Sequence, residues 1–208
     1  APAHDRLQGD NILPMRGSLH PVDDLWLAQA RHDAPHLAAL PSPHTVLLVG
    51  GPTRHAALDD GGFLALLRDL RARARNEGGS FSAVASRRTP PRWRDAMVEG
   101  DSTLPGRRWR DERDGPNPYA GLLAHADRIV CTPDSVNMLS EAAATLAPVF
   151  VWSPQVVQGR PRHFIDDVLA SGRVRARDDT LAPFVVAPLR ETARVADEVK
   201  RRLGLDIG

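Results

Sequence analysis

The residues from Asp134 to Glu141 carry the clearest sign of ligand chemistry in this sequence. Ser135 opens a predicted helix over residues 135–146. The apolar stripe of this helix, expected to face a sheet, consists of Val136, Leu139, Ala143 and Leu146. Glu141 lies on the opposite side. The free N–H groups at such a helix start form an anion site. The alternative is a plain Ser or Asp helix cap beside a solvated Glu141.

A second candidate is the loop that begins at Gly50 and Gly51 and continues through Thr53 and Arg54. Adjacent glycines let a phosphate approach the backbone closely, because they carry no side chain. The alternative is a simple tight turn between a strand and a helix. The chain contains no G-x-G-x-x-G sequence. The absence of this motif argues against a bound dinucleotide such as NAD.

Two adjacent arginines, Arg87 and Arg88, form the third candidate. A guanidinium group suits bidentate contacts with phosphate. Adjacent residues that leave a strand tend to point to opposite sides. We therefore expect one of the two to bind a diphosphate and the other to matter little, and we favour Arg88. The alternative is a solvated pair, or ion pairs with nearby carboxylates.

Other patterns that bring catalysis or metal binding are missing from the sequence. One cysteine is present, so neither an intrachain disulfide nor a cysteine-rich zinc site is expected. His32 and His36 have the spacing of a helical metal pair, but Pro35 interrupts any helix there. There is no D-x-D sequence, and no G-x-S-x-G that would place a nucleophilic serine. We therefore expect neither a metal nor a bound cofactor. Cys131 lies in an apolar run and is expected to be a small buried residue.

The candidate loops belong to a regular alternation of strands and helices that begins at His44. Short apolar runs predict strands at residues 45–49, 81–85, 128–132 and 148–152, with a weak one around Trp109. Helices are predicted at residues 59–76, 93–98, 135–146, 161–171 and 189–203, and another begins at Pro118. This alternation is typical of an α/β fold with a parallel, doubly wound sheet. Ligands of such sheets bind beyond the carboxyl ends of the strands, where all three loops are expected.

Composition limits the class of protein. The 208 residues contain 27 Lys and Arg against 26 Asp and Glu, a formal net charge of +1. A general nucleic-acid binder would be strongly basic, so no nucleic acid is expected as a partner. No apolar run approaches the roughly 18 residues that span a bilayer, and no signal peptide is recognised. We expect a soluble cytoplasmic protein whose contact with a membrane is at most peripheral.

The first part of the chain lacks this regularity. Residues 11–13 could form a short strand closed by Pro14, and residues 21–31 show helical spacing. A proline-bearing stretch follows, which is typical of a connector. We therefore expect residues 1–43 to be the remnant of an N-terminal domain with its linker. Residues 44–208 would then form one complete domain.

Residues 126–142, ADRIVCTPDSVNMLSEA, resemble the mitochondrial-fission "elongated mitochondria" family, a plant and bacterial family. Its members show an A-D pair, a strand and then T-x-D-S-V-S-M-x-S-E-A; Asn137 replaces the usual serine here. The other matching parts are Gly50-Gly51, Ser86-Arg87-Arg88-Thr89-Pro90, Asn117-Pro118-Tyr119, His4-Asp5-Arg6-Leu7, Asn11 and Gly17. Family members are longer at the N-terminus, and the family looks like GT-B glycosyltransferases.

The resemblance implies a Rossmann-like domain, the C-terminal half of a GT-B fold. It implies a metal-independent glycosyltransferase whose donor, a nucleoside diphosphate sugar, binds this domain. Glu141 would hold the ribose, and Ser135 with Val136 would hold the diphosphate. The leaving diphosphate would be neutralised by Arg87, Arg88 and Arg54. A catalytic base would come from the missing N-terminal domain, so this chain alone is expected to transfer no sugar.

Two alternatives to a transferase remain. The plant relatives act in organelle division through partner proteins, so the fold could be a non-catalytic docking surface. Bacterial members have often been labelled nucleoside-diphosphate-sugar epimerases, a label against which the missing dinucleotide fingerprint argues.

Overall fold

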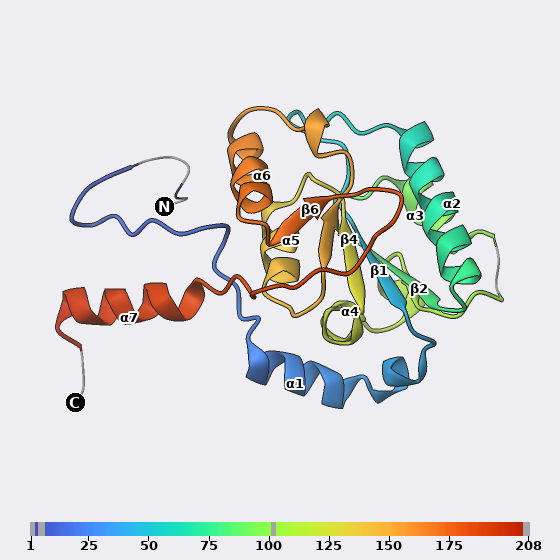
Figure 1. The fold of residues 1–208 in the computed structure, drawn as a ribbon, viewed down its shortest axis with the longest axis horizontal. Helices are drawn as coiled ribbons and strands as arrows, with labels where there is room; N and C mark the ends of the chain where they lie inside the picture. Colours follow the sequence, from blue (N-terminus) through green and yellow to red (C-terminus); the bar gives the residue numbers. More distant parts are fainter. Residues whose placement is uncertain (1–2, 4–6, 101–102, 206–208) are drawn as a thin grey trace.

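The computed structural model describes residue 3 and residues 7–100 and 103–205 of the chain (Figure 1). Its centre is one six-stranded sheet in the order β3-β2-β1-β4-β5-β6, and every neighbouring pair is parallel. The strands are β1 (His44–Val49), β2 (Ser80–Ala85), β3 (Arg108–Trp109), β4 (Arg128–Cys131), β5 (Val149–Val151) and β6 (Val174–Ala176). The predicted α/β fold with a doubly wound parallel sheet is confirmed.

Helices connect these strands. The α-helices are α1 (Asp24–Asp33), α2 (Asp60–Asn76), α3 (Pro91–Val98), α4 (Tyr119–His125), α5 (Val136–Ala143), α6 (Arg160–Ala170) and α7 (Thr192–Leu203). Short 3-10 helices are η2 (Pro35–Ala39), η3 (Glu112–Asp114) and η4 (Pro154–Val156). The crossovers through α2 and α3 run outward from β1 towards β3. Those through α4 and α5 run the other way, so right-handed crossovers place the two pairs on opposite faces.

The order of the strands reverses between β1 and β4. In β1, Leu47 lies opposite Ala83 of β2 on one side and Val130 of β4 on the other. This register brings the carboxyl ends of three strands to one edge of the sheet. A crevice at such a reversal is where open α/β sheets bind ligands.

The core explains why these segments are strands and helices. All residues of β1 and β2 are buried, as expected for central strands covered on both faces. Helix α2 begins after Asp59, whose side chain accepts a hydrogen bond from the N–H of Gly62 at 2.8 Å. The buried face of α2 consists of Phe63, Leu66, Leu67, Leu70 and Ala74, as predicted. Phe63 stacks on Trp93 of α3 with ring centroids 4.0 Å apart, so α2 and α3 share one aromatic core.

Helix α5 is shorter than predicted. It ends at Ala143 rather than at Leu146, whose side chain is 58% exposed instead of facing the sheet. The cause is Arg173, a buried side chain whose guanidinium donates hydrogen bonds to the carbonyls of Ala143 and Thr145 at 2.7 and 2.8 Å. These bonds satisfy the open carbonyls of a helix end, so the helix stops there.

Two further expectations were wrong, and one strand was not predicted. Residues 11–13 form no strand. The last helix begins at Thr192 rather than at residue 189. Strand β6 was not predicted, because only Val174 of its residues is buried and three residues are too few to show a period.

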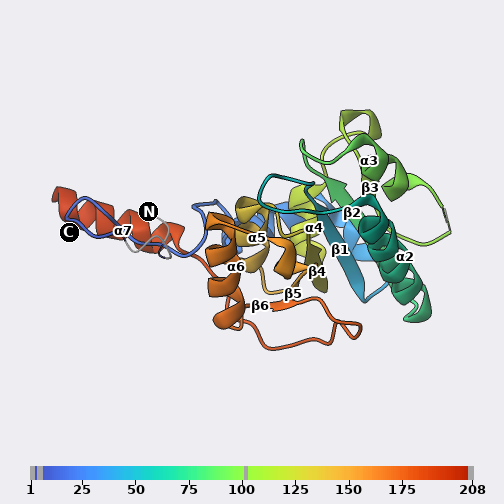
Figure 2. The same cartoon turned by 90° about the horizontal axis from the view of Figure 1, so that it is seen from above.

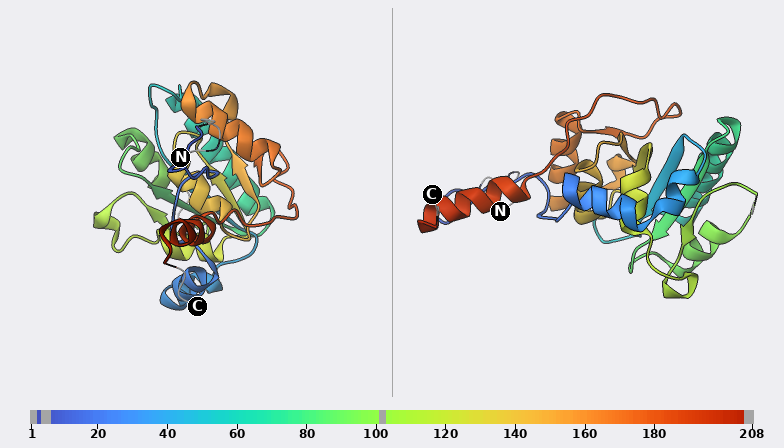
Figure 3. Two further views of the ribbon diagram at one scale, coloured as in Figure 1. Left: turned by 90° about the vertical axis from the view of Figure 1, so that its left-hand side faces the viewer. Right: turned by 90° about the horizontal axis from the view of Figure 1, so that it is seen from below.

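The N-terminal segment and α7 lie side by side and extend away from the sheet (Figures 1, 2 and 3). Arg194 of α7 donates to the carbonyl of Pro14 at 2.7 Å, and the N–H of His20 donates to the hydroxyl of Thr192 at 3.1 Å. Helix α7 contains no buried residue. Helix α1, by contrast, packs Leu27 and Ala30 near Ala124 of α4. His4, Asp5 and Arg6, which belong to the early part of the resemblance, lie outside the described residues.

No helix within residues 7–100 or 103–205 is both long enough and apolar enough to cross a bilayer. In the same part of the chain, no three His, Cys, Asp or Glu side chains gather as a metal site would require. Cys131 is buried within β4, where burial raises the pKa of its thiol above the usual range.

Candidate functional site

A cavity of about 660 Å³ opens at the carboxyl ends of β2 and β3. Its apolar walls come from Val84, Ala85, Trp109, Tyr119 and Met138. Its polar lining consists of Ser86, Arg87, Arg94, Arg110, Asp111, Glu112, Arg113 and Asn117. Met138 belongs to α5 and Tyr119 to α4, so the cavity lies between the carboxyl ends of β2 and β3 and the helices α4 and α5. A volume of this size suits a small-molecule ligand.

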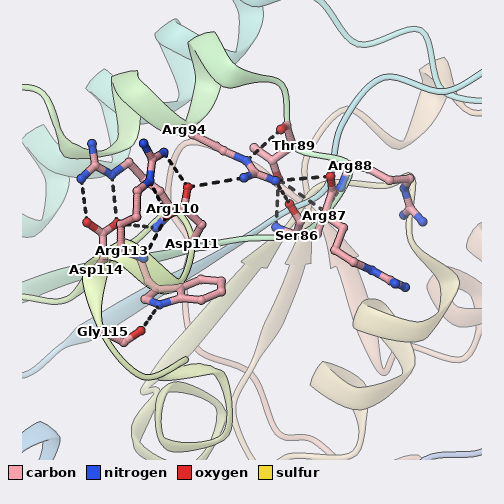
Figure 4. A network of polar contacts seen from close by, with 11 residues as sticks. Ser86, Arg87, Arg88, Thr89, Arg94, Arg110, Asp111, Arg113, Asp114 and Gly115 are labelled. Carbon is pink, nitrogen blue, oxygen red and sulfur yellow. Dashed lines mark hydrogen bonds and ion pairs between the residues drawn. The ribbon is translucent and has the colours of Figure 1, made fainter.

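Most charged groups around the cavity are already paired (Figure 4). Arg113 donates to both carboxylate oxygens of Asp111, at 2.9 and 2.8 Å. This contact holds the pKa of the Asp111 carboxyl well below its usual range. Arg110 contacts Asp114 in the same way, at 2.9 and 2.6 Å, and lowers the pKa of that carboxyl. These pairs give the loop after β3 its shape.

Arg94 of α3 holds the loop that follows β2. Its guanidinium donates to the carbonyls of Thr89 and Ser86, at 3.0 and 2.9 Å (Figure 4). It also lies 3.7 Å from a carboxylate oxygen of Asp111. The loops after β2 and β3 are therefore joined across one side of the cavity.

Arg87 differs from the other arginines of the cavity. Its exposed side chain lines the cavity, and no carboxylate of the described residues lies within ion-pair distance of it. A cation with no partner is available to an anionic ligand, whereas a paired one must first give up its partner. The structure thus separates Arg87 from Arg88, which is paired with Asp134 at 2.9 Å.

Gly50 and Gly51 lie where the loops after β1, β2 and β4 meet. A Cβ atom at Gly50 would lie 2.1 Å from Oδ1 of Asp134, and one at Gly51 would lie 2.4 Å from the carbonyl oxygen of Arg88. The Gly50 N–H donates to the hydroxyl of Thr132 at 2.8 Å. Both positions therefore require glycine for packing reasons within the protein. Their contact with a phosphate stays a prediction.

Thr53 and Arg54 lie in a turn that faces the loop after β5. The Thr53 hydroxyl accepts hydrogen bonds from the N–H groups of His55 and Ala56, at 3.1 and 3.0 Å. Ala56 forms a bridge to Val157, which follows β5. The Arg54 side chain is exposed and donates to the ring of His55 at 3.0 Å. Neither residue lines the 660 Å³ cavity.

Ser135 and Val136 open α5, as expected. The buried Ser135 hydroxyl accepts from the N–H of Met138 at 3.4 Å, so it caps the helix. Val136 is half-buried. Glu141, one helical turn after Met138, is half-buried rather than solvated, and it accepts a hydrogen bond from the Tyr119 hydroxyl. Burial, followed by the charge of Glu141, raises the pKa of Tyr119 above its usual range.

The segment before α1 covers the outer side of α5 close to Glu141. The Ser18 N–H donates to the Ser140 hydroxyl at 3.1 Å, and a Cβ atom at Gly17 would lie 2.4 Å from that hydroxyl oxygen. Burial lowers the pKa of His20, although the charge of Glu141 acts in the opposite direction. The predicted ribose ligand therefore lies between Tyr119 of the cavity wall and the N-terminal segment.

The structure brings together Gly50, Gly51, Arg88 and the residue before Ser135, and it places Arg87 in the neighbouring cavity. Thr53 and Arg54 lie apart from that cavity. Sequence reasoning missed most of the cavity, above all the loop of residues 110–119. Strand β3 has only two residues, so its carboxyl end was not recognised as an edge that positions ligand-binding residues.

The chain matches one protein family and two curated relatives. The family described as Mitochondrial fission ELM1 matches residues 1–203. Mitochondrial fission protein ELM1 of Arabidopsis thaliana is 31% identical over 203 residues, which are 93% of this chain and 46% of that protein. An uncharacterized protein of Rickettsia prowazekii is 25% identical over 212 residues, which are 98% of this chain and 58% of that protein. The chain spans about half the length of these curated relatives.

Two solved structures of Os79 from O. sativa are also similar. One is a complex with U2F and trichothecene, with a TM-score of 0.43 and 16% identity over 88% of this chain and 40% of that one. The other is a complex with UDP, with a TM-score of 0.41 and 15% identity over 91% of this chain and 42% of that one.

Proposed function

Because this chain belongs to the mitochondrial fission ELM1 family, we propose that it is the donor-binding half of a metal-independent, GT-B-like glycosyltransferase. The ligand in this proposal is a nucleoside diphosphate or its sugar conjugate. Residues 44–208 form the domain that binds it. Residues 1–43 lead from a preceding domain, which supplies the acceptor site and the catalytic base.

The observation that carries the proposal is the cavity at the carboxyl ends of β2 and β3, with Arg87 in its wall. The side chains of Trp109, Tyr119 and Met138 offer an apolar and aromatic surface that suits the flat face of a nucleobase. Arg87 offers a positive charge that no carboxylate of residues 7–100 and 103–205 pairs with. One ligand that combines a flat ring with an anionic group matches both features.

In this arrangement the nucleoside lies in the cavity and the diphosphate extends towards the start of α5. The N–H groups of Ser135 and Val136 and the guanidinium groups of Arg87 and Arg88 receive the phosphates. Glu141 accepts the ribose hydroxyls, supported by the Tyr119 hydroxyl. Gly50, Gly51, Thr53 and Arg54 border the sugar side of the diphosphate. Positive charge from arginine stabilises the leaving diphosphate in place of a metal ion.

Equilibrium binding tests the proposal. Calorimetric titrations with uridine, guanosine and adenosine diphosphates are compared with inorganic pyrophosphate. We expect at least one nucleoside diphosphate to bind more tightly than pyrophosphate, since only the nucleoside enters the cavity. Arg87→Ala should weaken that ligand about tenfold or more. Arg68→Ala is the matched control, because this exposed arginine of α2 lies outside the cavity. Nucleoside diphosphates that bind no better than pyrophosphate would contradict the proposal.

A second function, that of a non-catalytic docking protein, is favoured by a different observation. Of the arginines that line the cavity, Arg94, Arg110 and Arg113 are all occupied by carboxylates or carbonyls of the protein itself. A cavity built for a strongly charged ligand would leave more of its cations available. If no nucleotide or nucleotide sugar binds, this second function is the one to pursue.

A further inference from the structure

A buried carboxylate lies at the meeting point of the loops after β1, β2 and β4. The side chain of Asp134 has no exposed area. Its Oδ1 accepts a hydrogen bond from the Thr132 hydroxyl at 2.7 Å, and its Oδ2 accepts one from Nη2 of Arg88 at 2.9 Å. A buried charge is tolerated only when it is paired and hydrogen-bonded. Arg88 is the cationic partner of this carboxylate, at 2.9 Å.

The chain makes room for this carboxylate. The space that Asp134 fills is the space that a side chain at Gly50 would need, since a Cβ atom there would lie 2.1 and 2.2 Å from the two carboxylate oxygens. The Gly50 N–H donates to the Thr132 hydroxyl, which in turn donates to Asp134. The donors at this edge of the sheet are thus directed at an anion that belongs to the protein.

The two partners differ in their access to solvent. The side chain of Asp134 is fully covered, whereas that of Arg88 is 52% exposed. The backbone N–H of Arg88 donates to the Ser86 hydroxyl at 3.2 Å, and its carbonyl oxygen lies against Gly51. A dissolved anion therefore reaches the guanidinium group of Arg88 without having to enter the protein, while Asp134 contacts the same group from inside.

We propose that Asp134 is a tethered anion that occupies Arg88, and that a diphosphate binds this edge of the sheet by drawing Arg88 away from it. The carboxylate and the diphosphate compete for one guanidinium group, so Asp134 lowers the affinity for the ligand. Only a ligand with enough negative charge to compete with this carboxylate binds. The inference deepens the proposed function, because the diphosphate is the same group. It concerns only the phosphate end and needs no nucleoside.

Inorganic pyrophosphate is the probe, titrated into the chain by calorimetry at low salt. Asp134→Asn keeps the shape and the hydrogen bond with Thr132 but removes the competing charge. We expect it to bind pyrophosphate about tenfold or more tightly than the unmodified chain. Adding Arg88→Ala should abolish the gain. Asp127→Asn is the matched control: it makes the same change in net charge at the opposite end of β4, where Asp127 accepts a hydrogen bond from His44.

Equal affinities of the unmodified chain and Asp134→Asn would overturn the inference, and so would a gain that survives Arg88→Ala or appears in Asp127→Asn. No binding to either protein would overturn it too. If Asp134→Asn fails to fold, Asp134→Ser makes the same test with a smaller neutral side chain. The proposed function fails separately, when nucleoside diphosphates bind no better than pyrophosphate. A gain with pyrophosphate would support the inference even then.

Discussion

The hydroxyl of Tyr119 donates a hydrogen bond to Oε2 of Glu141, and this contact joins α4 to α5 beside the cavity. Tyr119 is the first residue of α4, and its N–H is held by Oδ1 of Asn117 at 2.9 Å. Two segments that lie far apart in sequence thus fix the position of one carboxylate.

Glu141→Ala should weaken binding of a nucleoside diphosphate about tenfold, because a hydrogen bond to a charged group is lost. Inorganic pyrophosphate should bind as before, since it carries no ribose. Calorimetry with both ligands makes the measurement, and Glu99→Ala, an exposed residue at the end of α3, is the control. An equal loss for both ligands would mean that Glu141 acts through the fold.

Tyr119 should resist ionisation at alkaline pH. It is the one tyrosine of the chain, so ultraviolet absorbance reports its phenolate without ambiguity. Burial and Glu141 raise its pKa in the folded state above the ordinary value of about 10. The contribution of this group to stability is complete below that value and is lost as pH rises above it, because the unfolded chain releases the proton first. A folded chain that titrates like free tyrosine would contradict this.

Acid should destabilise the fold through His44. Burial lowers the pKa of this imidazole, which bonds the Ser82 hydroxyl at 2.7 Å. The unfolded chain takes up a proton near the ordinary value of about 6.5 and the folded chain does not, so the free energy of unfolding falls as pH drops below that value. Urea denaturation on both sides of this pH measures the effect. His44→Gln should remove part of the dependence, and the same substitution at His32, on the exposed face of α1, is the control.

Arg173→Met should lower the free energy of unfolding by about 3 kcal/mol or more, because the carbonyls at the end of α5 lose their donors while buried. Burial lowers the pKa of Arg173 to about 10, yet it keeps its charge at neutral pH. Arg173→Lys should recover little, since an ammonium group lacks the planar fork that reaches several carbonyls. Denaturant midpoints decide the matter, with Arg68→Lys as the surface control.

Gly50→Ala should destabilise the chain by about 1–3 kcal/mol, because the added methyl group collides with the Asp134 carboxylate. Gly61→Ala in the first turn of α2 is the control, as its nearest neighbour there is 3.2 Å away. Combining Gly50→Ala with Asp134→Ser should restore part of the loss. Thermal unfolding of the single and double variants tests this, and strictly additive losses would show that the two residues do not compete for space.

The alternation of strands and helices could be predicted from the sequence by itself. The apolar run that is β1 and the spacing of Phe63, Leu66 and Leu70 in α2 are local patterns, and burial on both faces of a central sheet imposes them. A parallel sheet then predicts that the loops containing Gly50, Arg88 and Asp134 meet at one edge. The alternation and the meeting of these loops follow from backbone hydrogen bonding and from the spacing of apolar residues in each element. That spacing can be read from the sequence.

Only the tertiary structure decided which side chains at that edge are available. The ion pair of Arg88 with Asp134 joins two loops, and the contact between Tyr119 and Glu141 joins α4 to α5. Among the described residues that line the cavity, Arg87 is the arginine that no carboxylate pairs with. The end of α5 was likewise set by Arg173, which lies beyond the next strand. Such contacts depend on distances between segments that are remote along the chain, and no local spacing encodes them. The strength of a charged contact depends on burial and on the partner that arrives from elsewhere, so the chemistry of this edge was decided by packing.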